Sequence, residues 1–182
     1  MNAGAGDGTG ERPEEPAASP GQPARTLVIG LGNPLVSDDS VGLRIARELR
    51  ARLAHRSDVD VTEDYWGGLR LMERMIGYRR AIVVDAICSG APPGTIHHLT
   101  TDSLATQRSA SAHDVNLPTA LAFGRQAGAV LPADIDVRLV GIEALDVVNF
   151  SEQCTPDVAA AIPRAVEEVV RLVETPQGEP RQ

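Results

Sequence analysis

Three carboxylates and one histidine in this sequence stand where a metal ion could be bound. Asp38 and Asp39 are neighbours in the segment VIGLGNPLVSDDSVGLRIARELRARL. Asp85 interrupts the apolar stretch RRAIVVDAI, and His113 lies in the polar stretch SAHDVNLP. Two carboxylates and one imidazole are a suitable ligand set for a divalent first-row metal, with coordination positions left for water or substrate.

The first two acids follow an apolar run that ends in glycine and precede an amphipathic run. The turn lacks the third glycine of a dinucleotide-binding fingerprint, and carboxylates there would repel a pyrophosphate but attract a cation. A helix start also favours an acidic cap and an acidic first turn. We therefore expect Asp38 to cap the helix and Asp39 to point into a cleft.

Asp85 would be costly to bury alone, so it should meet a cation, a metal or several hydrogen-bond donors, and a purely structural role remains open. His113 precedes an expected helix within a polar loop, which indicates either a functional or a loop-anchoring role. The other histidines, His55, His97 and His98, lie at a helix end or along a strand and are expected to be surface or packing residues.

Apolar runs that alternate with amphipathic runs predict how these residues are positioned. Strands are expected at 26–32, 59–65, 79–87, within PPGTIHHLT and at 136–144; helices at 38–55, 69–76, 117–127 and 155–174; and a loop at 101–114. This order predicts an α/β fold: a single three-layer domain with a twisted, mostly parallel sheet and helices on both faces. Ligands of such sheets gather at the carboxyl ends of the strands, where these acids would lie.

Three residues should shape the ends and the course of the helices. Pro118 is acceptable in a first helical turn, and Thr155 is expected to cap the last helix. Pro163 removes a backbone donor and should bend or interrupt that helix.

The chain of 182 residues suits one domain, residues 25–174. A disordered N-terminal tail, 1–24, and a flexible C-terminal tail, 175–182, are expected on either side. The net charge of -8 without a basic cluster argues against a nucleic-acid partner. No apolar stretch suits a membrane span, so no membrane partner and a cytoplasmic location are expected.

The two cysteines, Cys88 and Cys154, are far apart and are expected to be small core residues or inert thiols. The sequence contains neither a His-Glu-x-x-His helix nor a Gly-x-Ser-x-Gly elbow, so a covalent nucleophile is not indicated.

The segments VIGLGNPLVSDDSVGLRIARELRARL, GYRRAIVVDAICSGAPPGTIHHL, SAHDVNLPTALAFGRQAG, VRLVGIEA and TPDVAAAIPRAVEEVV occur in the order seen in one family. Together the chain resembles the hydrogenase maturation proteases over nearly all of residues 26–174. The resemblance implies an endopeptidase that removes the C-terminal extension of a nickel-iron hydrogenase large-subunit precursor after nickel insertion. It also implies that Asp39, Asp85 and His113 bind nickel presented by the precursor and carry the reaction.

One segment departs from the family pattern. Many members have an Asp-Gly-Gly-Thr-like segment after the second strand, whereas this chain has EDYWGGL, 63–69. The class of hydrogenase served and the oligomeric state are therefore left open, and Trp66 either packs or lines the substrate groove. Two alternatives also remain: a non-catalytic module that binds metal or precursor, and an enzyme like peptidyl-tRNA hydrolase, because VIGLGNP resembles the opening of that family.

Overall fold

The structure is a computed structural model that describes residues 25–101 and 117–175. The two tails expected at 1–24 and 175–182 lie outside these residues, apart from residue 175. His113 also lies outside them, as does the expected loop at 101–114 apart from its first residue.

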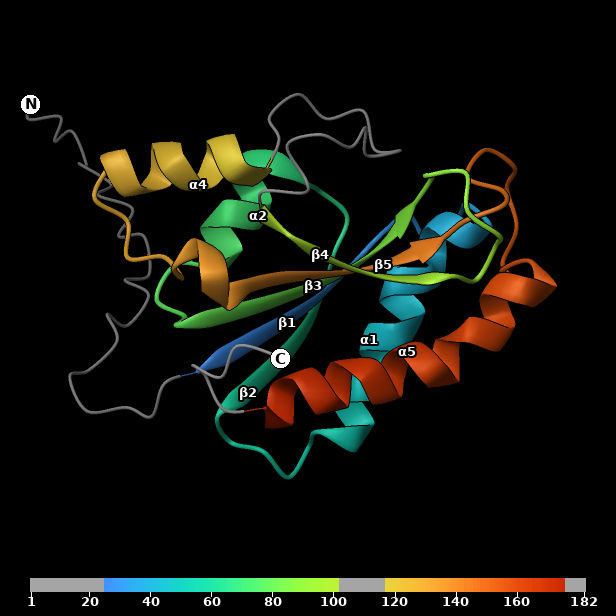
Figure 1. The fold of residues 1–182 in the computed structure, drawn as a ribbon, viewed down its shortest axis with the longest axis horizontal. Helices are drawn as coiled ribbons and strands as arrows, with labels where there is room; N and C mark the ends of the chain where they lie inside the picture. The colour runs from blue at the N-terminus through green and yellow to red at the C-terminus, as the bar shows by residue number, and fades with distance from the viewer. Residues whose placement is uncertain (1–24, 102–116, 176–182) are drawn as a thin grey trace, which may run out of the picture.

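A twisted sheet forms the centre of the described part of the chain (Figure 1). Its strands are β1 (Thr26–Leu31), β2 (Val59–Asp64), β3 (Arg80–Ile87), β4 (Ile96–Thr100) and β5 (Val137–Glu143). The spatial order is β2-β1-β3-β5-β4. All neighbouring strands run parallel except β4, which is antiparallel to β5 at one edge. The expected strands and the mostly parallel arrangement are confirmed.

Helices cover both faces of this sheet, as expected (Figure 1). The α-helices are α1 (Val41–Arg52), α2 (Gly68–Arg74), α4 (Leu117–Gln126) and α5 (Pro156–Glu174), and the short 3-10 helices are η1 (Asp38–Ser40) and η2 (Asp134–Asp136). Buried side chains of α1 and α5 form one core with the sheet, whereas those of α2 and α4 form a second core on its other face. The three-layer α/β prediction is thus confirmed.

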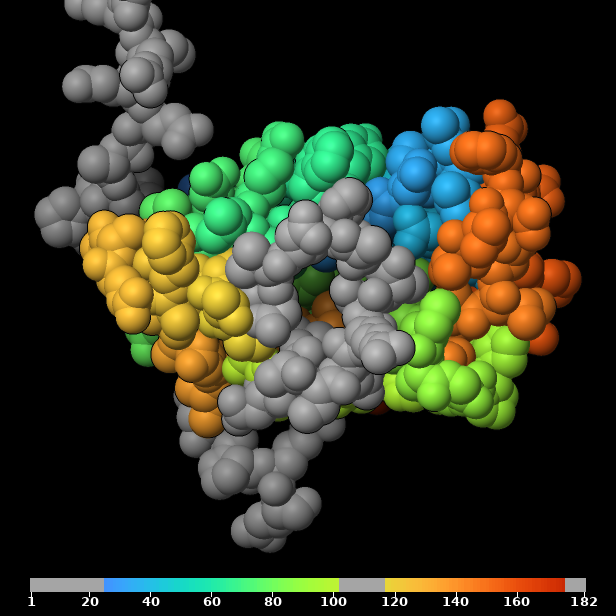
Figure 2. Space-filling model, turned by 90° about the horizontal axis from the view of Figure 1, so that it is seen from above, coloured from blue at the N-terminus to red at the C-terminus, as the bar shows by residue number. Residues whose placement is uncertain are grey.

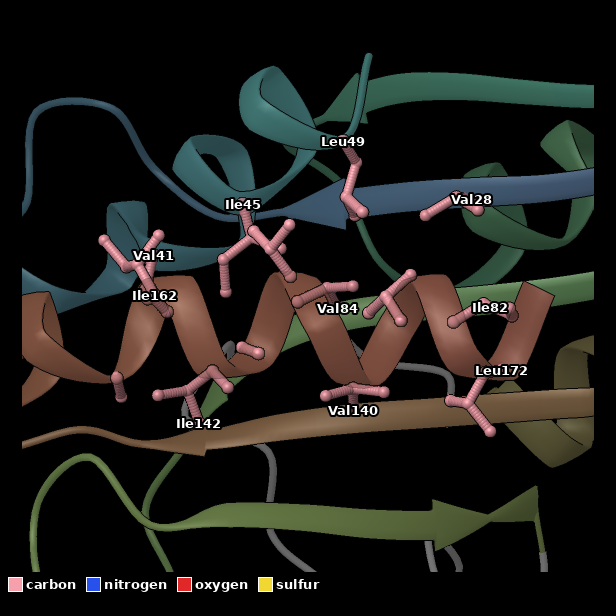
Figure 3. Close-up of a cluster of buried hydrophobic side chains, with 14 of the residues drawn as sticks. Val28, Val41, Ile45, Leu49, Ile82, Val84, Val140, Ile142, Ile162 and Leu172 are labelled. Atoms are coloured by element: carbon pink, nitrogen blue, oxygen red, sulfur yellow. The ribbon is translucent and has the colours of Figure 1, made fainter. Parts of the chain in front are cut away.

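The core between α1, α5 and the sheet fixes where α1 begins. Ile45 and Leu49 of α1 and Val84 of β3 are fully buried, and Figure 3 shows them together with Ile162 of α5. Complete burial of one such side chain contributes about 1.5–3 kcal/mol. These contacts hold the start of α1 over the carboxyl ends of the central strands.

Glycine allows α1 to approach the sheet closely. A Cβ atom on Gly42 would lie 2.2 Å from the carbonyl oxygen of Leu31 and 2.4 Å from that of Val84. A Cβ atom on Gly30 would lie 2.1 Å from the carbonyl oxygen of Gly42. The first turn of α1 therefore contacts the backbone of β1 and β3 directly, which brings the acidic turn before it against the sheet.

Two expectations about helices concern α5. This helix continues from Pro156 through Pro163 to Glu174, so of the two effects expected of Pro163, bending or interruption, interruption does not occur. Packing of its apolar face against the sheet and α1 offsets the backbone hydrogen bond that proline removes. Thr155 stands at the N-cap position, but its side chain makes no capping hydrogen bond to α5. Pro118 lies in the first turn of α4, as expected.

Candidate functional site

Asp38 is a structural residue that joins two distant loops. Its carboxylate is fully buried and accepts hydrogen bonds from the amides of Leu145 and Asp146 at 2.9 Å. Thr155 donates to the same carboxylate through its amide at 2.6 Å and through its hydroxyl at 2.9 Å. Four donors therefore compensate the burial of this charge.

The prediction that Asp38 caps the first helix is wrong. Neither η1 nor α1 has a side-chain cap hydrogen bond. The segment between β5 and α5 supplies the donors instead, and these direct the carboxylate away from the helix. The hydroxyl of Thr155, which does not cap α5, donates to Asp38.

Asp39 has a different environment from its neighbour. Its side chain is half-buried and, among the residues that the structure describes, accepts one hydrogen bond, from the amide of Asn33 at 2.8 Å. Burial raises the pKa of the Asp39 carboxyl, and the Asn33 bond offsets only part of this effect. Gly32 makes this turn possible, since its φ is 146° and a Cβ there would lie 1.8 Å from the Asp39 carbonyl oxygen.

Asp85 lies in the central strand β3 and is poor in hydrogen-bond donors. Within residues 25–101 and 117–175 its carboxylate accepts one hydrogen bond, from the next amide in the chain, Ala86, at 2.9 Å. Although some solvent reaches the side chain, burial and, to a smaller extent, the negative charge of Asp39 together raise the pKa of Asp85 to about 7. Several hydrogen-bond donors, one of the three kinds of partner expected for Asp85, are therefore not found within the described residues, in contrast to Asp38.

Asp39 and Asp85 together form a candidate cation site. The charge of Asp39 acts on Asp85, so the carboxylates lie in one electrostatic environment at the carboxyl ends of β1 and β3. Carboxylates with raised pKa values and spare acceptor capacity favour a bound cation, which would stabilise their ionised forms. The described residues contain no group of three or more His, Cys, Asp or Glu that could hold a metal. His113, the third expected ligand, lies outside these residues.

Glu143 is a buried acid that the sequence analysis missed. It ends β5 and is 2% exposed. Ser89 donates to it through its amide at 2.8 Å and its hydroxyl at 2.6 Å, and the amide of Gly90 donates at 2.8 Å. Burial opposes the charge, but these bonds outweigh it and lower the pKa of Glu143. The sequence pattern that could have identified Glu143 is the same as for Asp85, an acid within an apolar strand.

The histidines of the described part have surface or packing positions, as expected. Nε2 of His97 lies 3.3 Å from the Glu143 carboxylate, and Nε2 of His98 lies 3.5 Å from that of Glu168. His55 is exposed after α1.

The loop after β2, where the sequence departs from the family pattern, is ordered by Asp64. This buried carboxylate accepts hydrogen bonds from the amides of Tyr65 at 2.7 Å and Trp66 at 3.2 Å, and from Nε of Arg74 at 2.8 Å. Trp66 is 46% exposed, and the Arg70 guanidinium lies 5.7 Å from its ring centre. Trp66 is thus neither a core residue nor fully exposed.

The two cysteines are free thiols, but one of them is not a core residue. Cys88 is exposed beyond the end of β3, whereas Cys154 is half-buried. Burial raises the pKa of both thiols, and nearby carboxylates add to the effect at Cys88. Both therefore remain protonated at neutral pH, which agrees with the expectation of inert thiols.

Comparison with known proteins gives a consistent picture. A family model described as "Hydrogenase maturation protease" matches residues 43–172. The "Hydrogenase expression/formation protein HupD" of Rhizobium leguminosarum bv. viciae is 28% identical over 154 residues, which cover 83% of this chain and 75% of HupD. The "Hydrogenase 2 maturation protease" of Escherichia coli strain K12 is 30% identical over 151 residues, covering 80% of this chain and 88% of the relative.

Solved structures agree with these sequence matches. The "hydrogenase maturating endopeptidase HybD" from E. coli superposes with a TM-score of 0.68 at 28% identity, over 82% of this chain and 91% of HybD. A hydrogenase 2 maturation peptidase from Thaumarchaeota archaeon SCGC_AB-539-E09 has a TM-score of 0.60 at 26% identity, over 82% and 97% of the two chains. No helix in the described ranges is long and apolar enough to cross a membrane. The family match covers most of the chain and the fold agrees with it, so this chain belongs to the hydrogenase maturation protease family.

Proposed function

We propose that this protease removes the C-terminal extension of a nickel-iron hydrogenase large-subunit precursor after nickel has been inserted. We further propose that Asp39, Asp85 and His113 bind the nickel that the precursor carries. The observation that carries the proposal is the pair of donor-poor carboxylates, Asp39 and Asp85, at the carboxyl ends of two neighbouring strands. Membership of the protease family supports the reaction class.

The donor set suits a divalent cation that is already bound to another protein. Two carboxylates and an imidazole leave coordination positions to ligands of the precursor. Such an ion supplies alignment of the adjacent peptide bond, or Lewis acidity toward the water that attacks it. Because the pKa of Asp85 is about 7, this carboxyl is close to half protonated at neutral pH and releases its proton when it binds the cation.

Residues around the pair hold it in place rather than take part in binding. The Asn33 amide orients Asp39, and the close approach of Gly32 to the Asp39 backbone fixes the turn. Asp38 fixes the adjacent loop through its four donors. The two neighbouring aspartates thus have separate roles, one structural and one directed at the substrate.

The test is processing of a nickel-loaded large-subunit precursor, followed by mass spectrometry of its C-terminus. Asp39→Asn, Asp85→Asn and His113→Ala should each reduce the cleavage rate at least 100-fold. Asp134→Asn is a charge-matched control, because the Asp134 side chain is 58% exposed and precedes β5, at the amino ends of the parallel strands and so opposite the candidate site. Wild-type cleavage by all three site variants would reject the ligand assignment. Binding of the precursor by the wild-type chain without shortening would instead favour a non-catalytic module.

A further inference from the structure

A second feature beside the site concerns how a large protein substrate is held. Residues 33–38, between β1 and η1, pair with residues 145–151, between β5 and α5; the two segments are called the ribbon below. Asp38 donates its amide to the Asp146 carbonyl at 2.9 Å, Ser37 to that of Asn149 at 3.1 Å, and the Ser151 amide donates to the Leu35 carbonyl at 3.1 Å. Val36 and Phe150 form an antiparallel bridge. In Figure 2 the blue and orange segments lie against each other on this face.

The ribbon exposes apolar side chains to an unusual extent. Leu35 and Leu145 are each 64% exposed, Val148 is 79% exposed and Phe150 is 83% exposed. Large apolar side chains that gather in the exposed part of one short ribbon commonly mark an interaction site. Neither of the two hydrophobic cores includes any of them.

The ribbon is nevertheless well ordered, because buried and local polar contacts fix its backbone. The buried Asp38 carboxylate accepts hydrogen bonds from the amides of Leu145 and Asp146. The Asp146 carboxylate accepts hydrogen bonds from the Val148 amide at 3.1 Å and from the Asn149 amide at 3.0 Å, which closes a tight turn. A preorganised apolar surface loses little conformational entropy when a partner covers it.

The ribbon is continuous with the candidate site. The first segment of the ribbon, residues 33–38, begins at Asn33, whose amide donates to the Asp39 carboxylate. The same segment ends at Asp38, the neighbour of Asp39 in the chain. A protein whose scissile bond reaches Asp39 and Asp85 must therefore lie beside the ribbon. A second copy of this chain seated there would cover the approach to Asp39, which makes it a poor occupant for an enzyme with a protein substrate.

We propose that the ribbon docks an apolar surface of the folded hydrogenase large-subunit precursor next to its cleavable extension. This inference rests on the proposed function. The ribbon determines how tightly the precursor is bound, whereas Asp39 and Asp85 act at the bond that is cleaved. Loss of apolar contact should therefore raise KM and leave kcat nearly unchanged, because the interaction is equally present before and during the reaction.

The test variant is Val148→Ser combined with Phe150→Ser. Both side chains are exposed, so their replacement should not disturb folding. The matched control is Phe123→Ser combined with Ile135→Ser, since these residues are 58% and 72% exposed but lie on α4 and η2, away from the ribbon. The nickel-loaded precursor is the ligand in both assays. Kd is measured by biolayer interferometry in the Asp85→Asn background, and KM and kcat are measured by processing in the wild-type background.

The expected result is at least a tenfold rise in Kd and KM for the ribbon variant, with kcat within twofold of wild type and the control unchanged. Equal Kd values for ribbon variant and wild type, or an equal loss in the control, would overturn the docking proposal. Light scattering adds a third arm: an oligomer that dissociates in the ribbon variant while processing stays normal would assign the ribbon to a second copy. Failure of the proposed function can be told apart from failure of the docking proposal. In the first case the wild-type chain would leave the precursor uncleaved, whereas the Kd values would still report on docking.

Discussion

Replacement of Asp85 by asparagine should make the metal-free protein more stable at neutral pH while it abolishes processing. Asp85 is a carboxyl with one hydrogen-bond donor in the described part of the structure, and its pKa is raised to about 7 by burial and by Asp39. In the unfolded chain the same group has its ordinary value of 3.8. Between these two values the folded state binds the proton more tightly than the unfolded state.

The sign and size of the effect follow from proton linkage. The contribution of Asp85 to stability is present below about pH 4, where the carboxyl is protonated in both states. It is lost as the pH rises toward 7, because the unfolded chain releases this proton at a lower pH than the folded protein does. A difference of about 3 pH units corresponds to at most about 4 kcal/mol at pH 8. Solvent that reaches Asp85 reduces this figure, so a gain of about 1–3 kcal/mol is expected for the variant.

The measurement is urea unfolding of wild type and Asp85→Asn at pH 5 and pH 8, with a chelator to remove metal. The stability difference should favour the asparagine variant and should be clearly smaller at pH 5 than at pH 8. The free energy of unfolding should depend less steeply on pH in the variant than in wild type. A variant that is less stable than wild type at pH 8, or whose pH profile runs parallel to it, would refute the assignment of Asp85 as an uncompensated carboxyl.

Two further substitutions separate structural from functional residues. Asp38→Ala leaves the buried amides of Leu145, Asp146 and Thr155 without their acceptor, so it should lower the free energy of unfolding by about 3 kcal/mol in the same urea assay. An unchanged unfolding midpoint would contradict its role as the link between the two loops. Gly42→Ala places a Cβ 2.2 Å from the Leu31 carbonyl oxygen and should lower the melting temperature by at least 5 °C, as followed by circular dichroism. A melting temperature within 1 °C of wild type would show that α1 can move away from the sheet.

Much of the fold was predictable because it depends on local patterns. Strands such as β1 and β3 are continuous apolar runs buried on both faces, and helices such as α1 have one apolar face. Interruption of α5 at Pro163, one of its two expected effects, does not occur. A sequence pattern does not show how firmly the rest of α5 packs against the sheet. Tertiary packing outweighs the local penalty of one lost hydrogen bond there.

The candidate site was only partly predictable. Asp85 was evident as an acid in an apolar strand, and the choice of Asp39 over Asp38 as the residue directed at the substrate agrees with their hydrogen bonds. The capping role of Asp38 was wrong because its actual partners lie 107 to 117 residues further along the chain. Glu143 shows the same sequence pattern as Asp85, an acid in an apolar strand, but was not proposed as a site residue. Nothing in the neighbouring sequence shows that Ser89 and Gly90 donate hydrogen bonds to it. His113 stays a prediction.

The link from Asp38 to Thr155 spans 117 residues, which has a consequence during synthesis. Asp38 leaves the ribosome early, but its acceptor atoms find their last donors only once nearly the whole domain has been translated. Until then a carboxylate destined for the interior has no full set of partners, which favours keeping that part of the nascent chain open and hydrated. A half-made protease should therefore lack the fixed turn beside Asp39, which forms only after translation has passed Thr155.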